Sequence, residues 1–365
     1  MKSDNNQTLA SWGWTSNLAE LSNDDRPVGR VIETQYKRFL VATADREIWM
    51  TARSAMRLSA RFPVLGDWVK YQGETIVELL PAQNEVSRLA AGESGDLQVL
   101  GSFVDWVFVV CAVDQGININ KIERLALASK QSGAQVAIVI TKSDLFEPTE
   151  RTPVNPLCDA DEIDQALSAP KDRQSYELAL KSRLGQNVEL IFTSHLADSN
   201  TNESATRLGR VRQLLHTNGR HLTGLLLGSS GAGKSSLVNA LINKESQVIG
   251  GVRDRDGKGR HTTTVRRAFR VPTGGVIIDS PGLREMKLSQ SAAPSAGGSD
   301  SALSDQFEDI ESLALKCKFT TCSHSNEPGC KVQMAIRDGD LEPKRVASYT
   351  KLKKELAHQS RRAKR

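Results

Sequence analysis

The chain has 365 residues, of which 39% are hydrophobic and 25% are charged, a composition typical of a soluble globular protein with room for two or three domains. No apolar stretch is long enough to span a bilayer, and the N-terminal sequence lacks the apolar core of a signal peptide, so we expect no membrane partner and a cytoplasmic location. The five cysteines are an odd number with three close together, which does not indicate a disulfide framework.

Basic residues gather in two segments, although the formal net charge of +5 is modest. Residues 344–365 hold nine Lys or Arg against one acidic residue, and residues 253–267 hold six against two. Such local excess favours contact with a polyanion such as nucleic acid. The alternative is a solvated helix face followed by a frayed tail.

The first 98 residues divide into a polar tail and a small β-domain. We expect residues 1–26 to be a tail whose Trp12 and Trp14 rings cover the next domain, with a docking point for a partner as the alternative. Residues 27–98 contain five short strand-like stretches separated by turn-like breaks, a pattern typical of a small barrel such as an OB-fold. Composition does not distinguish an OB-fold from an SH3-like barrel. The stretches are 29–34, 38–44, 47–53, 66–72 and 74–80.

From residue 99 the pattern changes to alternating strands and helices. Continuous apolar runs indicate strands buried on both faces, and a helix is expected between the first two of them, at 118–133. We therefore predict an α/β domain with a mostly parallel, doubly wound sheet over residues 99–287. A polar insertion near 147–186 is expected to contain a helix at 175–184. The strand candidates are 104–113, 136–140, 188–192, 222–227 and 275–279.

The last region, residues 288–365, is predicted to be an α-helical C-terminal domain. It begins with a low-complexity, flexible loop at 289–304 and ends in a basic helix. Between these segments, three cysteines and a histidine lie within fourteen residues, a set that suits one structural Zn²⁺ ion in a closed tetrahedral site. The predicted zinc ligands are Cys317, Cys322, His324 and Cys330.

A phosphate-binding loop follows the apolar run at 222–227. The sequence GSSGAGKSS matches the pattern G-x-x-x-x-G-K-S and precedes a helix-like segment. Its backbone N–H groups would face the phosphates, and the helix N-terminus would favour negative charge. The lysine would reach the β- and γ-phosphates, and the hydroxyl of Ser235 would bind Mg²⁺. The predicted loop contacts are Gly228, Ser229, Ser230, Gly231, Ala232, Gly233, Lys234, Ser235 and Ser236.

Two later motifs complete a predicted Mg²⁺ and γ-phosphate site. Asp279 ends the strand VIID and would reach Mg²⁺ through water, while the Gly282 amide would sense the γ-phosphate. The stretch GKGRHTTT supplies switch threonines between the loop and this strand. We choose Thr263 as the Mg²⁺ ligand, with Thr262 and Thr264 as open alternatives.

The base motif lies before the phosphate loop. Directly after the strand at 136–140 comes Thr141-Lys142-Ser143-Asp144, which resembles the guanine motif N-K-x-D. The Asp144 carboxylate suits the two donors of guanine, and the Lys142 stem would pack on the ring. Thr141 lacks the amide of the usual Asn. After the strand at 188–192, Ser194 would brace Asp144, and the His195 amide would lie near guanine O6.

The order base, base, phosphate, switch, aspartate predicts a circularly permuted GTPase domain. A parallel sheet can tolerate this rearrangement because the termini of a domain often lie close together. Many GTPases place a water-orienting Gln where this chain has Leu283, so His261 is the candidate catalytic residue. The alternative is that His261 contacts RNA or solvent. Slow intrinsic turnover with activation by a partner is expected.

These features together resemble the RsgA (YjeQ) family of ribosome small subunit-dependent GTPases. The resemblance rests on TKSD, GSSGAGKSS, GKGRHTTT, DSPG and the C-x₄-C-x-H-x₅-C cluster, which extend over residues 141–330. It implies an N-terminal OB-fold, a permuted GTPase domain and a zinc-binding C-terminal domain. It also implies GTP hydrolysis stimulated by the small (30S) ribosomal subunit, contact with its rRNA, a role late in its maturation, and a link between His261 and hydrolysis. A monomer is expected.

Two other readings of the sequence compete with this one. An ATP-using P-loop enzyme would keep the phosphate loop, but TKSD argues against adenine. An RNA-binding module with a purely structural nucleotide site would explain the basic segments. The intact Lys234, Ser235 and Asp279 argue against that second alternative.

Overall fold

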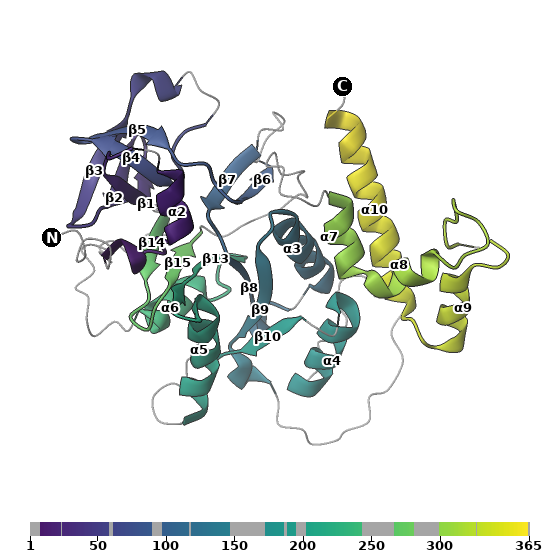
Figure 1. Ribbon diagram of the computed structural model, residues 1–365. Coiled ribbons are helices and arrows are strands. Elements are labelled where there is room, and N and C mark those ends of the chain that lie inside the picture. Colours follow the sequence, from purple (N-terminus) through teal and green to yellow (C-terminus); the bar gives the residue numbers. More distant parts are fainter. Residues whose placement is uncertain are drawn as a thin grey trace, which may run out of the picture.

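The computed structural model places a small barrel, a helix-covered central sheet and a helical C-terminal region in one chain (Figure 1). Within the part that it describes, no helix is both long and apolar enough to cross a membrane. The described residues are 8–22, 24–57, 61–89, 97–116, 118–146, 172–185, 188–194, 202–242, 266–280, 299–325 and 327–363.

Five strands close the N-terminal barrel in the order β1-β2-β3-β5-β4-β1. All neighbours pair antiparallel except β3 and β5, which are parallel. This closed five-stranded arrangement confirms the OB-fold prediction. Alternate side chains point inward, so Val31, Phe39, Met50 and Val69 form the interior. The strands are β1 (Val28–Gln35), β2 (Arg38–Ala42), β3 (Glu47–Ala52), β4 (Trp68–Gln72) and β5 (Thr75–Leu79), with a 3₁₀ turn η1 (Ser54–Arg57) before β4.

The N-terminal segment is packed rather than a free tail, which corrects the prediction for its described residues. Residues 8–10 are helical and a second helix, α2 (Ser16–Leu21), follows. Trp12 and Leu18 are 5% and 3% exposed, and the Trp14 ring meets the Trp68 ring of β4 at 4.7 Å between centroids. A few large apolar side chains therefore anchor a polar segment, and the tryptophans cover the barrel as expected.

The central sheet has the strand order β10-β9-β8-β13-β15-β14. The first five strands are parallel, and β14 runs antiparallel at the end. A parallel strand is buried on both faces, which explains the continuous apolar runs in the sequence. The strands are β8 (Trp106–Ala112), β9 (Gln135–Thr141), β10 (Glu189–Phe192), β13 (Thr223–Gly228), β14 (Arg266–Arg270) and β15 (Val276–Asp279). Two hairpins, which the sequence did not reveal, are β6 (Glu85–Leu89) with β7 (Leu97–Ser102), and β11 (His216–Thr217) with β12 (Arg220–His221).

Helices cover both faces of the central sheet. Apolar side chains of α3 and α4 pack with Val107 and Val109, whereas those of α5 and α6 pack with Phe108 and Val110. Residues that alternate along β8 therefore enter opposite cores. The Asn118 side chain accepts from the Lys121 N–H and caps α3. The helices are α3 (Ile119–Gln131), α4 (Arg173–Leu184), α5 (Asn202–Leu215) and α6 (Lys234–Leu241).

The barrel and the central sheet form one continuous sheet of eleven strands, because β14 pairs with β1. Arg30 of β1 strengthens this joint from within, since its side chain is only 2% exposed. Its guanidinium donates to the carbonyl of Gly66 at 3.1 Å and to the hydroxyl of Thr223, the first residue of β13, at 2.8 Å. It also donates to the Trp12 carbonyl. One buried cation thus joins three segments.

The C-terminal region is helical, as predicted, but part of its expected loop is not a loop. The sequence predicted a flexible loop over 289–304, whereas residues 299–304 belong to α7. Leu303 is 3% exposed in the C-terminal core, so tertiary packing outweighs the low-complexity composition there. The helices are α7 (Ser299–Gln306), α8 (Glu308–Ala314), α9 (Lys331–Asp338) and α10 (Pro343–Ala363).

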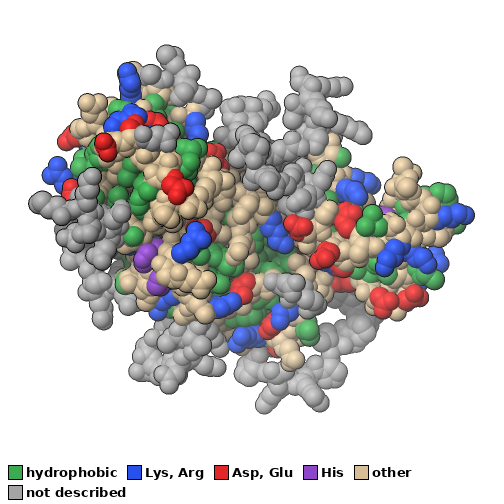
Figure 2. All heavy atoms as spheres, viewed as in Figure 1, with side chains coloured by type: hydrophobic (Ala, Val, Ile, Leu, Met, Phe, Trp, Pro, Cys, Tyr) green, Lys and Arg blue, Asp and Glu red, His purple; other side chains and the backbone are tan. Residues whose placement is uncertain are grey.

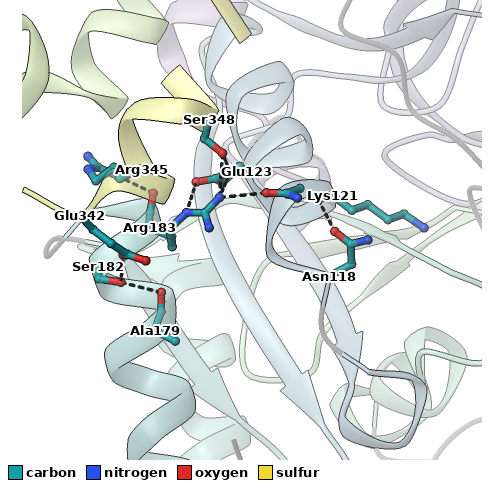
Figure 3. Close-up of polar contacts among 10 residues, drawn as sticks. Asn118, Lys121, Glu123, Ala179, Ser182, Arg183, Glu342, Arg345 and Ser348 are labelled. Carbon is teal, nitrogen blue, oxygen red and sulfur yellow. Dashed lines mark hydrogen bonds and ion pairs between the residues drawn. The ribbon is translucent and has the colours of Figure 1, made fainter. Parts of the chain in front are cut away.

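A buried ion pair attaches this region to the central domain. Figure 3 shows Arg183 of α4 between Glu123 of α3 and Ser348 of α10. The guanidinium lies 3.0 Å from the Glu123 carboxylate and donates to the Ser348 hydroxyl at 2.7 Å. Removing one member of such a buried pair costs about 3–5 kcal/mol.

Candidate nucleotide site and metal centre

The loop between β13 and α6 has the backbone of a phosphate cradle. Gly231 and Gly233 have φ angles of 78° and 87°, in the left-handed region that favours glycine. A Cβ atom on Gly228 would lie 2.3 Å from the Val110 carbonyl oxygen, so the loop can pass this close to β8 only without a side chain. The three glycines of the motif therefore have steric reasons for their positions.

Lys234 begins α6 and turns its side chain back into the loop. Its ammonium donates to the carbonyls of Gly228 at 3.1 Å and Ser229 at 2.8 Å. The residue is 6% exposed, and burial lowers the pKa of the amine while the nearby Asp279 opposes that shift. A desolvated ammonium among backbone groups is a strong binding point for phosphate oxygens.

Ser235 and Asp279 lie side by side where α6 begins and β15 ends. The Ser235 hydroxyl donates to Oδ2 of Asp279 at 3.2 Å. The other carboxylate oxygen, Oδ1, is buried and has no hydrogen-bond partner among the described residues. Burial raises the pKa of Asp279, and the Ser235 hydroxyl and the Lys234 charge oppose that rise. A hydroxyl beside an unpaired carboxylate oxygen fits Mg²⁺, a cation that prefers oxygen ligands.

The base motif occupies the ends of β9 and β10, which are parallel neighbours. Lys142 has a left-handed backbone with φ of 56°, and it leads into a 3₁₀ turn, η3 (Ser143–Leu145). The Ser143 N–H donates to the Thr193 carbonyl at 3.0 Å and fixes the turn against β10. The Ser194 hydroxyl donates to the exposed carboxylate of Asp144. The sequence-based pairing of these two side chains is therefore present in the structure.

Thr141 connects the base motif to the phosphate loop. Its hydroxyl donates to the Ala232 carbonyl at 2.8 Å, and the Cys111 carbonyl is a second acceptor at 3.2 Å. The usual Asn would offer an amide to tether the two loops, and Thr141 lacks that amide. The geometry supplies such a tether, because a single hydroxyl proton suffices to join the two loops.

Asp114 and Gln115 also belong to the site, although no motif singled them out. They lie in a 3₁₀ turn, η2 (Val113–Gln115), directly after β8. Gln115 accepts from the Ser229 hydroxyl at 2.7 Å and donates to the Ser230 carbonyl at 2.8 Å. Asp114 pairs with Lys142 at 2.5 Å. The sequence could have indicated these two residues only through their position directly after the predicted strand at 104–113. Ligands bind at the carboxyl ends of the strands in open α/β sheets.

Several predicted site residues lie outside the described residues. His195, the switch threonines Thr262 to Thr264 and Gly282 are among them, and so is the candidate catalytic residue His261. The structure brings together Thr141, Lys142, Asp144, Ser194, the loop from Gly228 to Ser236, and Asp279.

The second site is the Cys₃His cluster between α8 and α9. The ligand atoms of all four side chains lie within 4.8 Å of one another. The Cys317 and Cys330 sulfurs are 3.7 and 3.6 Å from Nδ1 of His324, and 3.9 Å from each other. Two ligands of a tetrahedral zinc ion are separated by about 3.8 Å or slightly less. The arrangement can therefore hold a metal ion with little rearrangement.

Local backbone geometry prepares this cluster. Gly329 and His324 have φ angles of 81° and 59°, so the chain turns tightly between ligands. Burial acts to raise the pKa of Cys317, but the N–H groups of Lys331 and Val332 at the start of α9 reverse that effect and lower it. The outcome favours a thiolate, which is the form that binds metal. By contrast, burial in β8 raises the pKa of Cys111 to about 12.

Comparison with known proteins identifies the chain's relatives. A family model described as RsgA GTPase matches residues 79–289. The "Small ribosomal subunit biogenesis GTPase RsgA" of Xanthomonas axonopodis pv. citri is 36% identical over 302 residues, which are 81% of this chain and 72% of the relative. The protein of the same name from Xanthomonas campestris pv. campestris is 34% identical over 334 residues, which are 90% of this chain and 80% of that protein.

Two solved structures share the fold. YjeQ from Thermotoga maritima has a TM-score of 0.56 and 21% identity, and the match covers 91% of this chain and 99% of YjeQ. YloQ, described as a circularly permuted GTPase, has the same TM-score and identity, with 92% and 96% coverage. The sequence predicted a circularly permuted GTPase domain, and YloQ is described as the same kind of fold. The chain belongs to the RsgA GTPase family.

Proposed function

We propose that this protein binds GTP, hydrolyses it to GDP and phosphate, and acts in the late biogenesis of the small ribosomal subunit, which stimulates the hydrolysis. The observation that carries the proposal is the arrangement of Asp144, braced by Ser194, beside the phosphate loop that Thr141 joins to it. The printed name of the relatives supports the ribosomal role.

The base specificity follows from charge and hydrogen bonding at Asp144. The guanine ring presents an N1–H and a 2-amino group, and a single carboxylate can accept a hydrogen bond from each of them. Adenine presents no such pair of donors. The Ser194 hydroxyl occupies one lone pair of the carboxylate and fixes its direction. The Lys142 stem packs on the ring face, and the His195 amide lies near guanine O6.

The phosphates and Mg²⁺ occupy the loop and its neighbours. Lys234 leaves the Gly228 and Ser229 carbonyls for phosphate oxygens, and Ser235, Asp279 and Thr263 hold Mg²⁺. A bound Mg²⁺ neutralises charge that develops on the phosphates during hydrolysis. Gly282 senses the γ-phosphate, and His261 orients the attacking water.

We further propose that the Cys₃His cluster binds one structural Zn²⁺ ion. Four protein ligands leave no open position for substrate or water, so the ion's role is to hold the α8–α9 connection together. Cys330 also accepts from the Gln333 N–H at 3.4 Å and caps α9, which links the ion to the helical core.

The C-terminal helix α10 is a candidate surface for rRNA. Its buried side chains Leu352 and Leu356 pack inward, whereas Lys344, Lys351 and Lys354 are exposed. Figure 2 shows Lys and Arg side chains on the surface of the C-terminal region, interspersed with acidic ones. Phosphate contacts of this kind make binding dependent on salt concentration. With a ribosomal partner, we place the protein in the cytoplasm as a monomer.

The test is nucleotide hydrolysis by the purified protein, alone and with purified small ribosomal subunits, with ATP as the control nucleotide. Strong stimulation selective for GTP is the expected result. Turnover of GTP that is indifferent to subunits would remove the ribosomal assignment but keep the GTPase. Turnover of ATP would overturn the role of Asp144. His261→Ala then tests the catalytic role. Loss of a residue that orients the attacking water should lower the stimulated rate of hydrolysis without weakening GTP binding.

A further inference from the structure

One row of residues crosses the joint between the barrel and the nucleotide site. Glu33 of β1 pairs with Arg267 of β14, and Arg267 pairs on its other side with Asp279 of β15. Residues directly opposite each other in antiparallel strands point to the same face, with Cβ atoms about 4.5–5.5 Å apart. The arginine thus lies between a barrel carboxylate and the proposed Mg²⁺ aspartate.

The Arg267 side chain is bound on the barrel side. Its guanidinium lies 3.3 Å from the Glu33 carboxylate and donates to the Glu47 carboxylate at 3.2 Å. The Phe269 ring, on the same face of β14, lies 5.8 Å below the guanidinium. Two barrel carboxylates, one on β1 and one on β3, therefore bind the Arg267 cation together. The register of β14 and β15 places the same arginine opposite a third carboxylate, that of Asp279.

That third carboxylate remains available. Oδ2 of Asp279 accepts from Ser235, and Oδ1 is buried with no hydrogen-bond partner within the described part of the chain. A buried carboxylate oxygen without a partner is costly, and Arg267 lies directly across the strand pair from it, whereas Lys234 acts on the same carboxylate from α6. An Arg267–Asp279 pair would occupy the oxygen that a Mg²⁺ ion or its water shell needs.

We infer that Glu33 and Glu47 of the barrel are positioning residues that hold Arg267 away from Asp279 and so keep this aspartate free for Mg²⁺. The barrel then contributes to the nucleotide site without touching the nucleotide. The inference rests on the proposed Mg²⁺ site and adds to it a specific role for one ion-pair cluster at the domain joint.

The test measures Mg²⁺ affinity rather than turnover. Full-length protein loaded with a fluorescent GDP analogue should release it more slowly as the Mg²⁺ concentration rises, and the Mg²⁺ concentration at half-maximal slowing is the readout. For E33Q/E47Q, we expect that concentration to rise by about two- to fivefold, the size that a partly exposed ion pair supports. Adding R267Q to this double variant should return the value to near that of the wild type, because the competing cation is gone.

A charge-matched control separates competition from a general loss of negative charge. D45N/E74Q removes two exposed barrel carboxylates and should leave the Mg²⁺ requirement unchanged. If the Mg²⁺ requirement of E33Q/E47Q is unchanged, or if that of the triple variant does not return toward the wild-type value, the inference is wrong. The proposed Mg²⁺ site would still stand. Restoration also excludes misfolding as the cause. If nucleotide release from the wild-type protein were independent of Mg²⁺, the proposed Mg²⁺ site would fail and this inference with it.

Discussion

The nucleotide site and the Cys₃His cluster are built in opposite ways. All four candidate ligands of the cluster come from residues 317–330, and local turns bring them together. The described nucleotide site collects side chains from the ends of β8, β9, β10, β13 and β15, between Asp114 and Asp279. A local site depends on its ion and a few turns, whereas a topological site depends on the register of a whole sheet.

This contrast implies that substitutions at the two sites change different properties of the protein. In the proposed site, Lys234 and Asp144 bind a nucleotide held by a rigid sheet, so their loss should change nucleotide affinity without changing the fold. The cysteines lie in a region that contacts the central domain mainly through α7 against α3 and α10 against α4. Loss of a cysteine should therefore change the fold of that region without changing nucleotide affinity.

Lys234→Ala should produce the largest change in nucleotide affinity. In the proposed site the ammonium would make charge-assisted hydrogen bonds to phosphate in a desolvated loop, so we expect GTP to bind at least about a hundredfold more weakly. The thermal midpoint should stay close to that of the wild type. Titration with a fluorescent GTP analogue measures the first quantity and calorimetry the second. Lys316→Ala, at an exposed lysine in the C-terminal region, is the control.

Asp144→Asn should have the next largest effect. Two hydrogen bonds to a charged acceptor are lost, which predicts GTP binding weaker by roughly ten- to a hundredfold. Xanthosine triphosphate carries a carbonyl in place of the 2-amino group, so it should bind the variant better than it binds the wild type. Competition between the two nucleotides measures the exchange.

Ser194→Ala is the matched variant for Asp144. It removes only the brace, and we expect a loss of a few-fold in GTP affinity with unchanged base preference. Equal affinity for GTP and the xanthine nucleotide in wild-type protein would contradict the base assignment.

Cys322→Ser should have the smallest effect on nucleotide binding, within about twofold, although it removes one of the four proposed metal ligands. The expected result is loss of bound zinc and increased protease cleavage between α8 and α9, because metal binding and folding are linked. Metal analysis and limited proteolysis measure these outcomes. Thr321→Ala changes an adjacent exposed residue that is not a ligand, and it should keep its zinc. A Cys322 variant that retains zinc would refute the ligand assignment.

The comparison also explains what could be predicted from the sequence. The barrel strands, the phosphate loop and the cluster were predictable, because alternation, glycines and ligand spacing are local signals. The placement of Ser194 beside Asp144 followed from parallel strand order. Gln115 and Asp114 carry no local signal, since their contacts arise only when β8 lies between β9 and β13.

The differences between prediction and structure have the same origin. The N-terminal segment and residues 299–304 are polar enough to be expected as a tail and a loop. Their few apolar side chains, such as Trp12 and Leu303, find cores that are distant in the sequence. The pairing of β14 with β1 likewise depends on contacts more than 200 residues apart, which no periodic pattern reports.

The buried contacts of Arg30 have a consequence for the order in which the chain folds during synthesis. Its hydrogen bond to Thr223 spans 193 residues, and the bond from Arg270 to Ser11 spans 259. Ser11 and Arg30 leave the ribosome well before their partners Thr223 and Arg270 are made. Contacts so distant along the chain close slowly, since the intervening loop must lose its entropy first. Ser11 and Arg30 are therefore expected to reach their native packing long after their own synthesis, once Thr223 and Arg270 have been made.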